Sequence, residues 1–215
     1  MQLLAVLKPD GTLRRAAGAN MLTGLNESGL CNILTFRKVH ATTELLERHY
    51  QHISGRTFYN WLINYIASGP SYAMLVEAEP ENIWKLRDLL GSTRAHEAKL
   101  GTLRFENAPY GGANCVHLSD SQESANVEVI LWKDYFKLLP GQFDMPIEEY
   151  IRRYINGPNN TKAVRNLCIE IASKGRPILQ ADEHKLRLLL KEECVDATEE
   201  EFDSLVTSLR EGCYY

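Results

Sequence analysis

The sequence predicts an α+β protein in which an antiparallel sheet covered by helices is followed by a small all-α part. Up to Lys137, short apolar runs typical of strands alternate with segments whose apolar residues recur every three or four positions, as in helices. Beyond Lys137 the strand pattern ceases, and Pro140-Gly141 favours a hinge. We therefore divide the 215 residues into a mixed domain, residues 1–137, and an all-α domain, residues 138–215, called the helical extension below.

Four apolar runs in the mixed domain carry the strand pattern. They are Leu3–Leu7, Cys31–Val39, Tyr72–Val76 and Asn114–Leu118. The first run stops at Lys8-Pro9-Asp10-Gly11, where proline and glycine predict a turn, so a strand delivers a lysine to a loop. Ser68-Gly69-Pro70 is a break before the third run. One polar residue, His117, interrupts the fourth.

Helical periodicity lies between and after these strands. The predicted helices cover Ala16–Glu27, Glu44–Ile53, Glu81–Leu90 and a segment reaching Trp132. Asp120 and Glu123 have the spacing of a capping box and are expected to open the last of them. The stretch Ser92–Gly112 is too long to be an idle connection in a compact domain, and long loops often carry function.

The helical extension shows four further helix patterns. Their ranges are Pro146–Ile155, Thr161–Ser173, Asp182–Glu193 and Thr198–Arg210. Asp144 and Thr161 are expected to cap the first two, and Thr198 with Glu201 forms a capping box for the fourth. The apolar stripes of these helices must be buried against one another, against the mixed domain or against a protein partner, and the sequence leaves these options open.

Composition excludes several classes of protein. The net charge is −4, with 24 basic residues against 28 acidic ones, which makes nucleic-acid binding unexpected because phosphates attract a basic surplus. No apolar stretch is long enough for a membrane span, and we expect no secretory leader. Five cysteines without a C-x-x-C pair indicate neither a disulfide framework nor a cysteine-rich zinc site. We therefore expect a cytoplasmic protein.

His117 is the residue most suggestive of chemistry. A histidine within an apolar strand is commonly a hydrogen-bonded core residue, but Glu128 falls two turns into the next helix, where its carboxylate could orient the imidazole. A histidine that accepts phosphate also needs cations to hold the remaining phosphates. The candidates are Lys8, Arg56, Arg87 and Arg104, each of which could alternatively be a solvated surface charge. The other histidines are expected at the surface: His40, His49, His52, His96 and His184.

A series of short motifs then follows one family pattern in order. The motifs are Leu7-Lys8-Pro9-Asp10-Gly11, His49-Tyr50, Arg56-Thr57-Phe58, Ser68-Gly69-Pro70, Leu90-Gly91-Ser92-Thr93, Gly101-Thr102-Leu103-Arg104, and Asn114-Cys115-Val116-His117-Leu118-Ser119-Asp120-Ser121 with Ser124-Ala125. With this order and spacing, residues 1–135 resemble the nucleoside diphosphate kinase family. The resemblance implies a ferredoxin-like fold with a four-stranded antiparallel sheet and covering helices.

The resemblance also implies a role for each matching residue. His117 would be the catalytic nucleophile that takes the γ-phosphate of a nucleoside triphosphate and passes it to a nucleoside diphosphate by a ping-pong mechanism. Its imidazole would be held by Glu128 and Ser119. The nucleotide would be bound at the phosphates by Lys8, Tyr50, Arg87, Thr93 and Arg104, at the base by Phe58 and Leu62, and at the sugar by Asn114. Mg²⁺ would be carried by the nucleotide phosphates, with no metal ligands from the protein, and the chain would form a homo-oligomer.

The chain departs from the family pattern at several positions. Leu118 stands where the family has glycine, and its side chain is expected either to crowd the phosphate or to demand a backbone conformation that only glycine adopts at low cost. The other departures are Phe105-Glu106, Ala113, Arg94-Ala95 and Asn60-Trp61. An alternative hypothesis is therefore a nucleotide-binding sensor or scaffold with impaired turnover, whose helical extension binds a protein partner. A purely structural interaction protein would leave the pocket residues unexplained.

Overall fold

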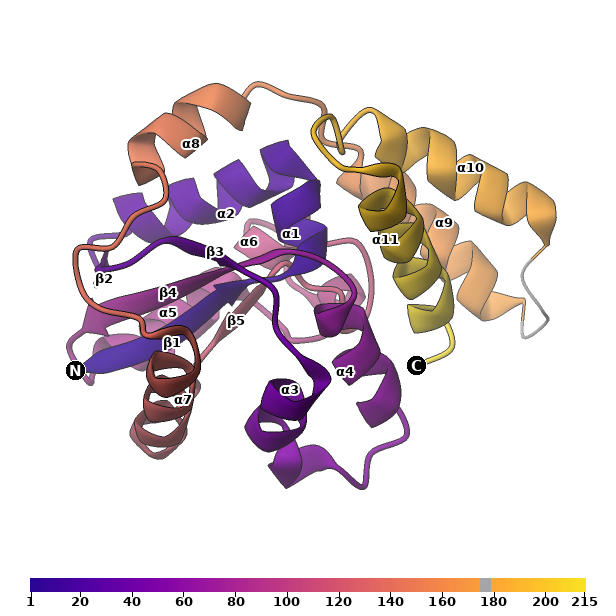
Figure 1. Cartoon of the computed structure of the whole chain (residues 1–215). Helices are drawn as coiled ribbons and strands as arrows, with labels where there is room; N and C mark the ends of the chain where they lie inside the picture. Colours follow the sequence, from indigo (N-terminus) through magenta and orange to yellow (C-terminus); the bar gives the residue numbers. More distant parts are fainter. Residues whose placement is uncertain (175–178) are drawn as a thin grey trace.

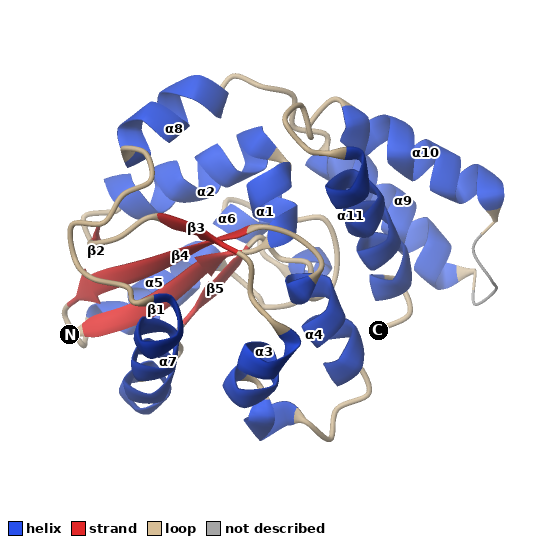
Figure 2. Cartoon of the chain, in the orientation of Figure 1, coloured by secondary structure: helices blue, strands red, loops and turns tan. Residues whose placement is uncertain are grey.

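The computed structural model describes residues 1–174 and 179–215 as an α+β fold, as the sequence predicts (Figure 1). Within these residues the sheet is antiparallel throughout and has the order β2-β4-β1-β5, with β3 also paired to β4. The strands are β1 (Gln2–Leu7), β2 (Cys31–Ile33), β3 (Arg37–Val39), β4 (Ser71–Ala78) and β5 (Val116–Leu118). Figure 2 shows helices on both faces of this sheet.

The sheet has five described strands where four were predicted, because the run Cys31–Val39 is split into β2 and β3. At the break, the Thr35 hydroxyl accepts the hydrogen bond of the Leu75 backbone N–H at 2.7 Å in place of a backbone carbonyl. The Phe36 N–H turns away to the Gln142 carbonyl, 3.0 Å away. A side chain and a second segment therefore replace two rungs of the β-ladder.

The turn predicted at residues 8–11 is wrong, since these residues enter the helix α1 (Pro9–Leu13). Proline suits the first helical position because its missing N–H would have no partner there, and the Thr12 N–H donates to the Lys8 carbonyl at 2.8 Å. Proline and glycine thus start a helix here instead of a turn. Lys8 still ends a strand, as expected.

The remaining helices of residues 1–137 agree with the sequence pattern except at four places. They are α2 (Arg15–Glu27), α3 (Thr43–His49), α4 (Tyr59–Ala67), α5 (Asn82–Leu90), α6 (Leu103–Asn107) and α7 (Gln122–Phe136). At one of these places, the helix predicted over Glu44–Ile53 ends at His49, and Gln51–Ile53 is a separate 3₁₀ helix. Helix α4 was not predicted, and α6 lies inside the stretch expected to be irregular. The capping box of α7 uses Ser121 and Ser124, not Asp120 and Glu123. The start of α7 is therefore one residue later than the acidic pattern suggested.

The helical extension contains α8 (Ile147–Tyr154), α9 (Thr161–Ser173), α10 (Gln180–Lys191) and α11 (Glu199–Gly212), close to the predicted ranges. Thr198 and Glu201 form the predicted capping box. The other two caps differ: Asn160, not Thr161, precedes α9, and the Asp144 carboxylate accepts from the Lys38 N–H at 2.7 Å instead of capping α8.

Two clusters of buried side chains lie on opposite faces of the sheet, because successive strand residues point to opposite sides. Leu4 and Val6 of β1 join one cluster with α3, α4, α7, α9, α10 and α11. Leu3, Ala5 and Leu7 join the other with α2, α5 and α8. In Figure 1, α8 lies over α2, while α9–α11 gather beside α4 and α6. The helical extension therefore contributes to the core on both faces.

Among residues 1–174 and 179–215, every helix falls short of the combined length and apolarity that crossing a membrane requires.

Candidate active site

His117 lies on β5 and faces the cluster formed with α3 and α7. It is paired with Val6 of β1, and its side chain keeps 18% of its surface exposed. Its neighbour Leu118 points to the opposite face, where it is buried with Val116 in the other cluster. The expectation that Leu118 crowds the phosphate is therefore wrong, since the strand turns that side chain away from the histidine.

Glu128 of α7 holds the imidazole of His117. The Nε2 of His117 lies 3.0 Å from Oε2 of Glu128, and the Ser119 hydroxyl donates to the same oxygen at 2.6 Å. Burial would raise the pKa of Glu128, but His117 and Ser119 outweigh it and lower this pKa to about 2. An ionised carboxylate can only accept hydrogen bonds, so it assigns the proton of neutral His117 to Nε2. The lone pair is then on Nδ1.

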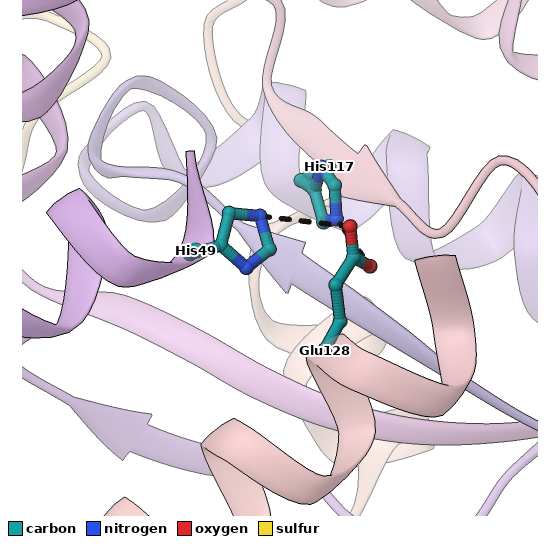
Figure 3. A group of neighbouring side chains, drawn as sticks. All are labelled: His49, His117 and Glu128. Carbon is teal, nitrogen blue, oxygen red and sulfur yellow. Dashed lines mark hydrogen bonds and ion pairs between the residues drawn. The ribbon is translucent and has the colours of Figure 1, made fainter. Parts of the chain in front are cut away.

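A second histidine, His49 at the end of α3, completes this group (Figure 3). Both imidazole rings point toward the Glu128 carboxylate, and Nε2 of His49 lies 3.8 Å from Oε1. His49 was expected at the surface but is 6% exposed, and burial, with help from His117, lowers its pKa to about 3. The sequence placed His49 beside Tyr50 but gave no sign that its ring turns inward.

His49, His117 and Glu128 offer three possible metal ligands within 4.8 Å of one another. However, the Trp132 indole N–H donates to Nδ1 of His49 at 3.1 Å. Nδ1 is therefore the acceptor, and the proton of neutral His49 lies on Nε2, the atom that faces Glu128. Because a metal would need the lone pair of that nitrogen, the group suits a positioned carboxylate better than a metal ion.

Lys8, at the end of β1, is a buried cation bound to neutral oxygens. Its Nζ donates to Oδ1 of Asn114 at 3.0 Å and to the Gly112 carbonyl at 3.3 Å, and the residue is 4% exposed. Within the described residues no carboxylate forms an ion pair with it. Burial lowers the pKa of Lys8 to about 8, and Arg104 contributes to the decrease. The Nδ2 of Asn114 donates to the Thr93 carbonyl at 2.7 Å, which ties Thr93 to the same corner.

Arg104, on α6, lies close enough to Lys8 for their charges to interact. Its Nη1 and Nη2 donate to the carbonyls of Gly91 and Val116, at 2.8 and 2.7 Å, while its buried Nε has no hydrogen-bond partner. Burial and the nearby Arg87 lower the pKa of Arg104 to about 10. Arg87 itself forms a long contact of 3.8 Å with the exposed Asp120. The cations therefore repel one another, and an anion between them would relieve that repulsion.

The backbone before His117 is held in an unusual conformation. Cys115 has φ = 65°, a left-handed value that is uncommon for a residue other than glycine. Its N–H donates to the buried Asp10 carboxylate at 3.0 Å, and Asp10 also accepts from the Tyr65 hydroxyl. Of the three residues, only Cys115 lies between Asn114 and His117 in the chain. Asp10 and Cys115 stand within the sequence motifs, but no role was predicted for either, and Tyr65 was not singled out. Such strain is typical of functional sites.

The structure brings most of the predicted residues together, with two exceptions. Tyr50, 8% exposed, lies with its ring centroid 6.2 Å from that of His117. Phe58 and Leu62 lie at the start of α4, half-buried and buried respectively, and within the described residues no hydrogen bond or ring contact joins them to His117. Arg56, the remaining candidate cation, is exposed in the loop before them. The side chains that surround His117 are therefore those of His49, Tyr50 and Glu128.

Comparisons with known proteins agree on one family. The family model "Nucleoside diphosphate kinase" matches residues 2–137. The nucleoside diphosphate kinase of Methanosphaera stadtmanae is 36% identical over 146 residues, which cover 68% of this chain and 93% of that protein. The enzyme of the same name from Thermoanaerobacter sp. is 41% identical over 130 residues, covering 60% and 93%.

Solved structures show the same likeness. The apo nucleoside diphosphate kinase of Encephalitozoon cuniculi matches with a TM-score of 0.56 and 28% identity, covering 61% of this chain and 87% of that one. The Aquifex aeolicus nucleoside diphosphate kinase matches with a TM-score of 0.57 and 26% identity, covering 64% and 98%. The family model ends at residue 137, so it leaves the helical extension unmatched.

Proposed function

Because the chain belongs to the nucleoside diphosphate kinase family, we propose that it transfers the γ-phosphate of a nucleoside triphosphate to a nucleoside diphosphate through a phosphorylated His117. The observation that carries this proposal is the hydrogen bond between Nε2 of His117 and Glu128. This bond directs the Nδ1 lone pair away from the carboxylate. A neutral imidazole nitrogen is a competent nucleophile near pH 7.

The transfer proceeds in two balanced half-reactions. In the first, Nδ1 of His117 attacks the γ-phosphorus, a nitrogen–phosphorus bond forms, and the bond to the bridging oxygen breaks as the nucleoside diphosphate leaves. Glu128 accepts the hydrogen bond of Nε2–H and so stabilises the positive charge that develops on the ring. In the second, a terminal phosphate oxygen of the incoming nucleoside diphosphate attacks the same phosphorus and frees Nδ1. The outcome is ping-pong kinetics.

The phosphates would be bound by the cations that surround His117. Lys8, Arg87 and Arg104 supply charge, with Tyr50 and Thr93 at the same site and Asn114 toward the sugar. Support comes from the surroundings of Lys8 and Arg104, which are buried, donate to neutral oxygens and form no ion pair with a carboxylate among the described residues. Burial lowers the pKa of both side chains, although the charge of Asp10 opposes that shift. Bound phosphates would supply the missing negative charge. Phosphoryl transfer depends chiefly on this kind of positioning and electrostatic stabilisation.

Mg²⁺ would enter this site bound to the phosphates of the nucleotide. The donor set is cationic, and the nearest acids already have partners: Glu128 binds His117 and Asp120 faces Arg87. Mg²⁺ commonly binds substrate phosphates and keeps several waters, so it does not need a protein cage. When bound, it neutralises phosphate charge.

Phe58 and Leu62 would contact the base. An aromatic ring stacks on the π-face that all bases share and does not read their edges, so we expect weak selectivity among nucleotides. The alternative of an impaired sensor rested on Leu118 and on the altered loop at Phe105-Glu106. The Leu118 side chain is buried on the far side of the strand from His117, which removes the first of these two grounds.

Cellular location and assembly belong to the same proposal. All five cysteines are free and buried, which suits a reducing cytoplasm. We propose a homo-oligomer, as the family resemblance implies, in which the helical extension of residues 138–215 is an appended unit that could also meet a protein partner. Light scattering of the purified full chain would measure its mass.

Incubation with [γ-³²P]ATP tests the proposal. We expect an acid-labile, base-stable phosphoryl adduct that a nucleoside diphosphate chases into triphosphate. His117→Gln removes the nucleophile and should lower the transfer rate at least about 10³-fold. His40→Gln is the matched control, since this exposed histidine lies at the edge of β3. A wild-type chain that binds ATP but forms no adduct would contradict the proposal.

A further inference from the structure

We propose that Arg165 of the helical extension is a positioning residue for Arg104, an inference that rests on the function proposed above. Arg165 and Thr161 lie four residues apart on α9 and therefore on the same face of that helix. This face meets the C-terminal end of α6, the short helix that carries Arg104. The family model does not include either residue of α9.

Arg165 donates to several carbonyls at the C-terminal end of α6; one of them, that of Arg104, also accepts from the Ala108 N–H at 2.9 Å. Its Nη2 donates to the carbonyls of Arg104 at 3.1 Å and Phe105 at 2.6 Å, and also to that of Ala108. Its Nε donates to the Pro109 carbonyl at 3.3 Å. The last carbonyls of a helix have no partners within the helix, so one buried guanidinium here replaces several waters. Arg165 is 7% exposed, and its guanidinium also packs over the Phe105 ring.

Thr161 secures the same helix end at Asn107. Its hydroxyl donates to the Asn107 carbonyl at 3.0 Å, and that carbonyl also accepts from Nη1 of Arg14 at 2.9 Å. The Asn107 side chain is bound as well, because Nδ2 of Asn159 donates to its Oδ1. Two turns of the helical extension thus hold the backbone from residue 104 to residue 109.

The following segment is held by another part of the helical extension. Gly112 lies against the Trp61 ring, so closely that an added Cβ would come within 2.9 Å of it. Trp61 in turn donates from its indole N–H to the Ser208 carbonyl of α11 at 2.9 Å. The Gly112 carbonyl accepts from Lys8. Trp61, one of the residues that depart from the family pattern, therefore links α11 to the Gly112 backbone, which in turn contacts Lys8.

The consequence for the site follows from the Arg104 side chain. Its guanidinium reaches the carbonyl of Val116, the residue before His117, so a shift of the α6 backbone moves a phosphate-binding cation relative to the nucleophile. Small misplacements of such groups cost much of the rate. Arg165 therefore acts through Arg104 and does not touch the nucleotide.

Three variants of the full chain test this role. In Arg165→Met, we expect kcat/KM and ADP affinity both to fall about tenfold, because several buried carbonyls lose their donor. Arg165→Lys keeps the charge and three donors but loses the planar fork, so it should recover only part of the loss. The control is Arg187→Met, since Arg187 also forms ion pairs within the helical extension, with Glu183 and Asp203, and packs over the Phe202 ring, but in the described part of the chain it makes no contact with α6.

Hydrogen exchange separates this inference from the proposed function. Amides of residues 105–108 should exchange faster in Arg165→Met than in Arg187→Met, whether or not nucleotide is present. Thr161→Val, a milder change on the same face, should show a smaller increase and keeps the test available if Arg165→Met folds poorly. A purely structural role would lower the melting temperature yet leave kcat/KM unchanged well below it, and that result would overturn the inference. An inactive wild-type chain with the expected exchange pattern would instead contradict the proposed function.

Discussion

Two regions of the molecule bury cations in opposite ways. Near His117, Lys8 and Arg104 donate to neutral oxygens, and burial lowers the pKa of both side chains. At the junction with the helical extension, Arg14 is fully buried but binds both oxygens of Glu193, at 2.8 and 2.9 Å. Burial there opposes its charge, but Glu193 outweighs it and raises the pKa of Arg14. At the junction, the buried cation has a carboxylate partner. Near His117, the buried cations form no ion pair with a carboxylate among the described residues.

The difference shows how a buried cation can indicate either structure or binding. A cation with its carboxylate holds two segments together, and its removal leaves an unpaired charge in the interior. A cation without a carboxylate costs stability in the free protein and is useful where an anionic ligand will arrive. The two regions should therefore respond differently to the same kind of substitution.

The largest expected effect is at the junction. Arg14→Met should lower the free energy of unfolding by about 3–5 kcal/mol, because Glu193 would remain buried without its partner. The double variant Arg14→Met/Glu193→Leu should recover part of this loss, since no unpaired charge is left. Urea denaturation of the single and double variants measures both. A single variant within about 1 kcal/mol of wild type would show that the pair is not structural.

Lys8→Met, in contrast to Arg14→Met, should weaken ADP binding and leave stability nearly unchanged. Its free energy of unfolding should stay within about 1 kcal/mol of wild type, because the lost hydrogen bonds are offset by relief of a buried charge. ADP binding should weaken by about 1.5–3 kcal/mol, the range for hydrogen bonds to charged groups. Calorimetric titration with Mg·ADP checks the second number. If Lys8→Met were as unstable as Arg14→Met, the distinction between the two regions would fail.

The sequence predicted the residues of the region near His117 because the patterns that place them are short and local. Six residues suffice to predict the apolar strand that precedes Lys8. Glu128 is near His117 because a short strand, a turn and two turns of helix separate them in the chain. The order of motifs then identified Asn114, Thr93 and Arg104 together. These residues are close in sequence to the elements that place them.

The sequence did not predict the contacts at the junction, because they join residues that are far apart in the chain. Arg14 and Glu193 are 179 positions apart, and neither has a neighbour pattern that indicates burial. The same holds for His49 and Trp132, which are 83 positions apart. Helix α4 was missed although five of its nine residues, among them Trp61 and Ile63, are buried in the core. Tertiary packing, which the sequence does not display, decided each of these.

The smallest expected effect is a pH dependence that isolates Lys8. With a folded-state pKa near 8 and an unfolded value of 10.5, Lys8 binds fewer protons in the folded chain between these pH values. Stability then rises with pH, so the free energy of unfolding of wild type relative to Lys8→Met should increase from pH 8 to pH 10. Over the same range Mg·ADP affinity should fall, since a neutral amine no longer attracts phosphate. Lys8→Arg, which stays charged, should lose both trends. A wild-type difference that stays flat across this range would mean that Lys8 is better solvated, or better paired, than its contacts with Asn114 and Gly112 indicate.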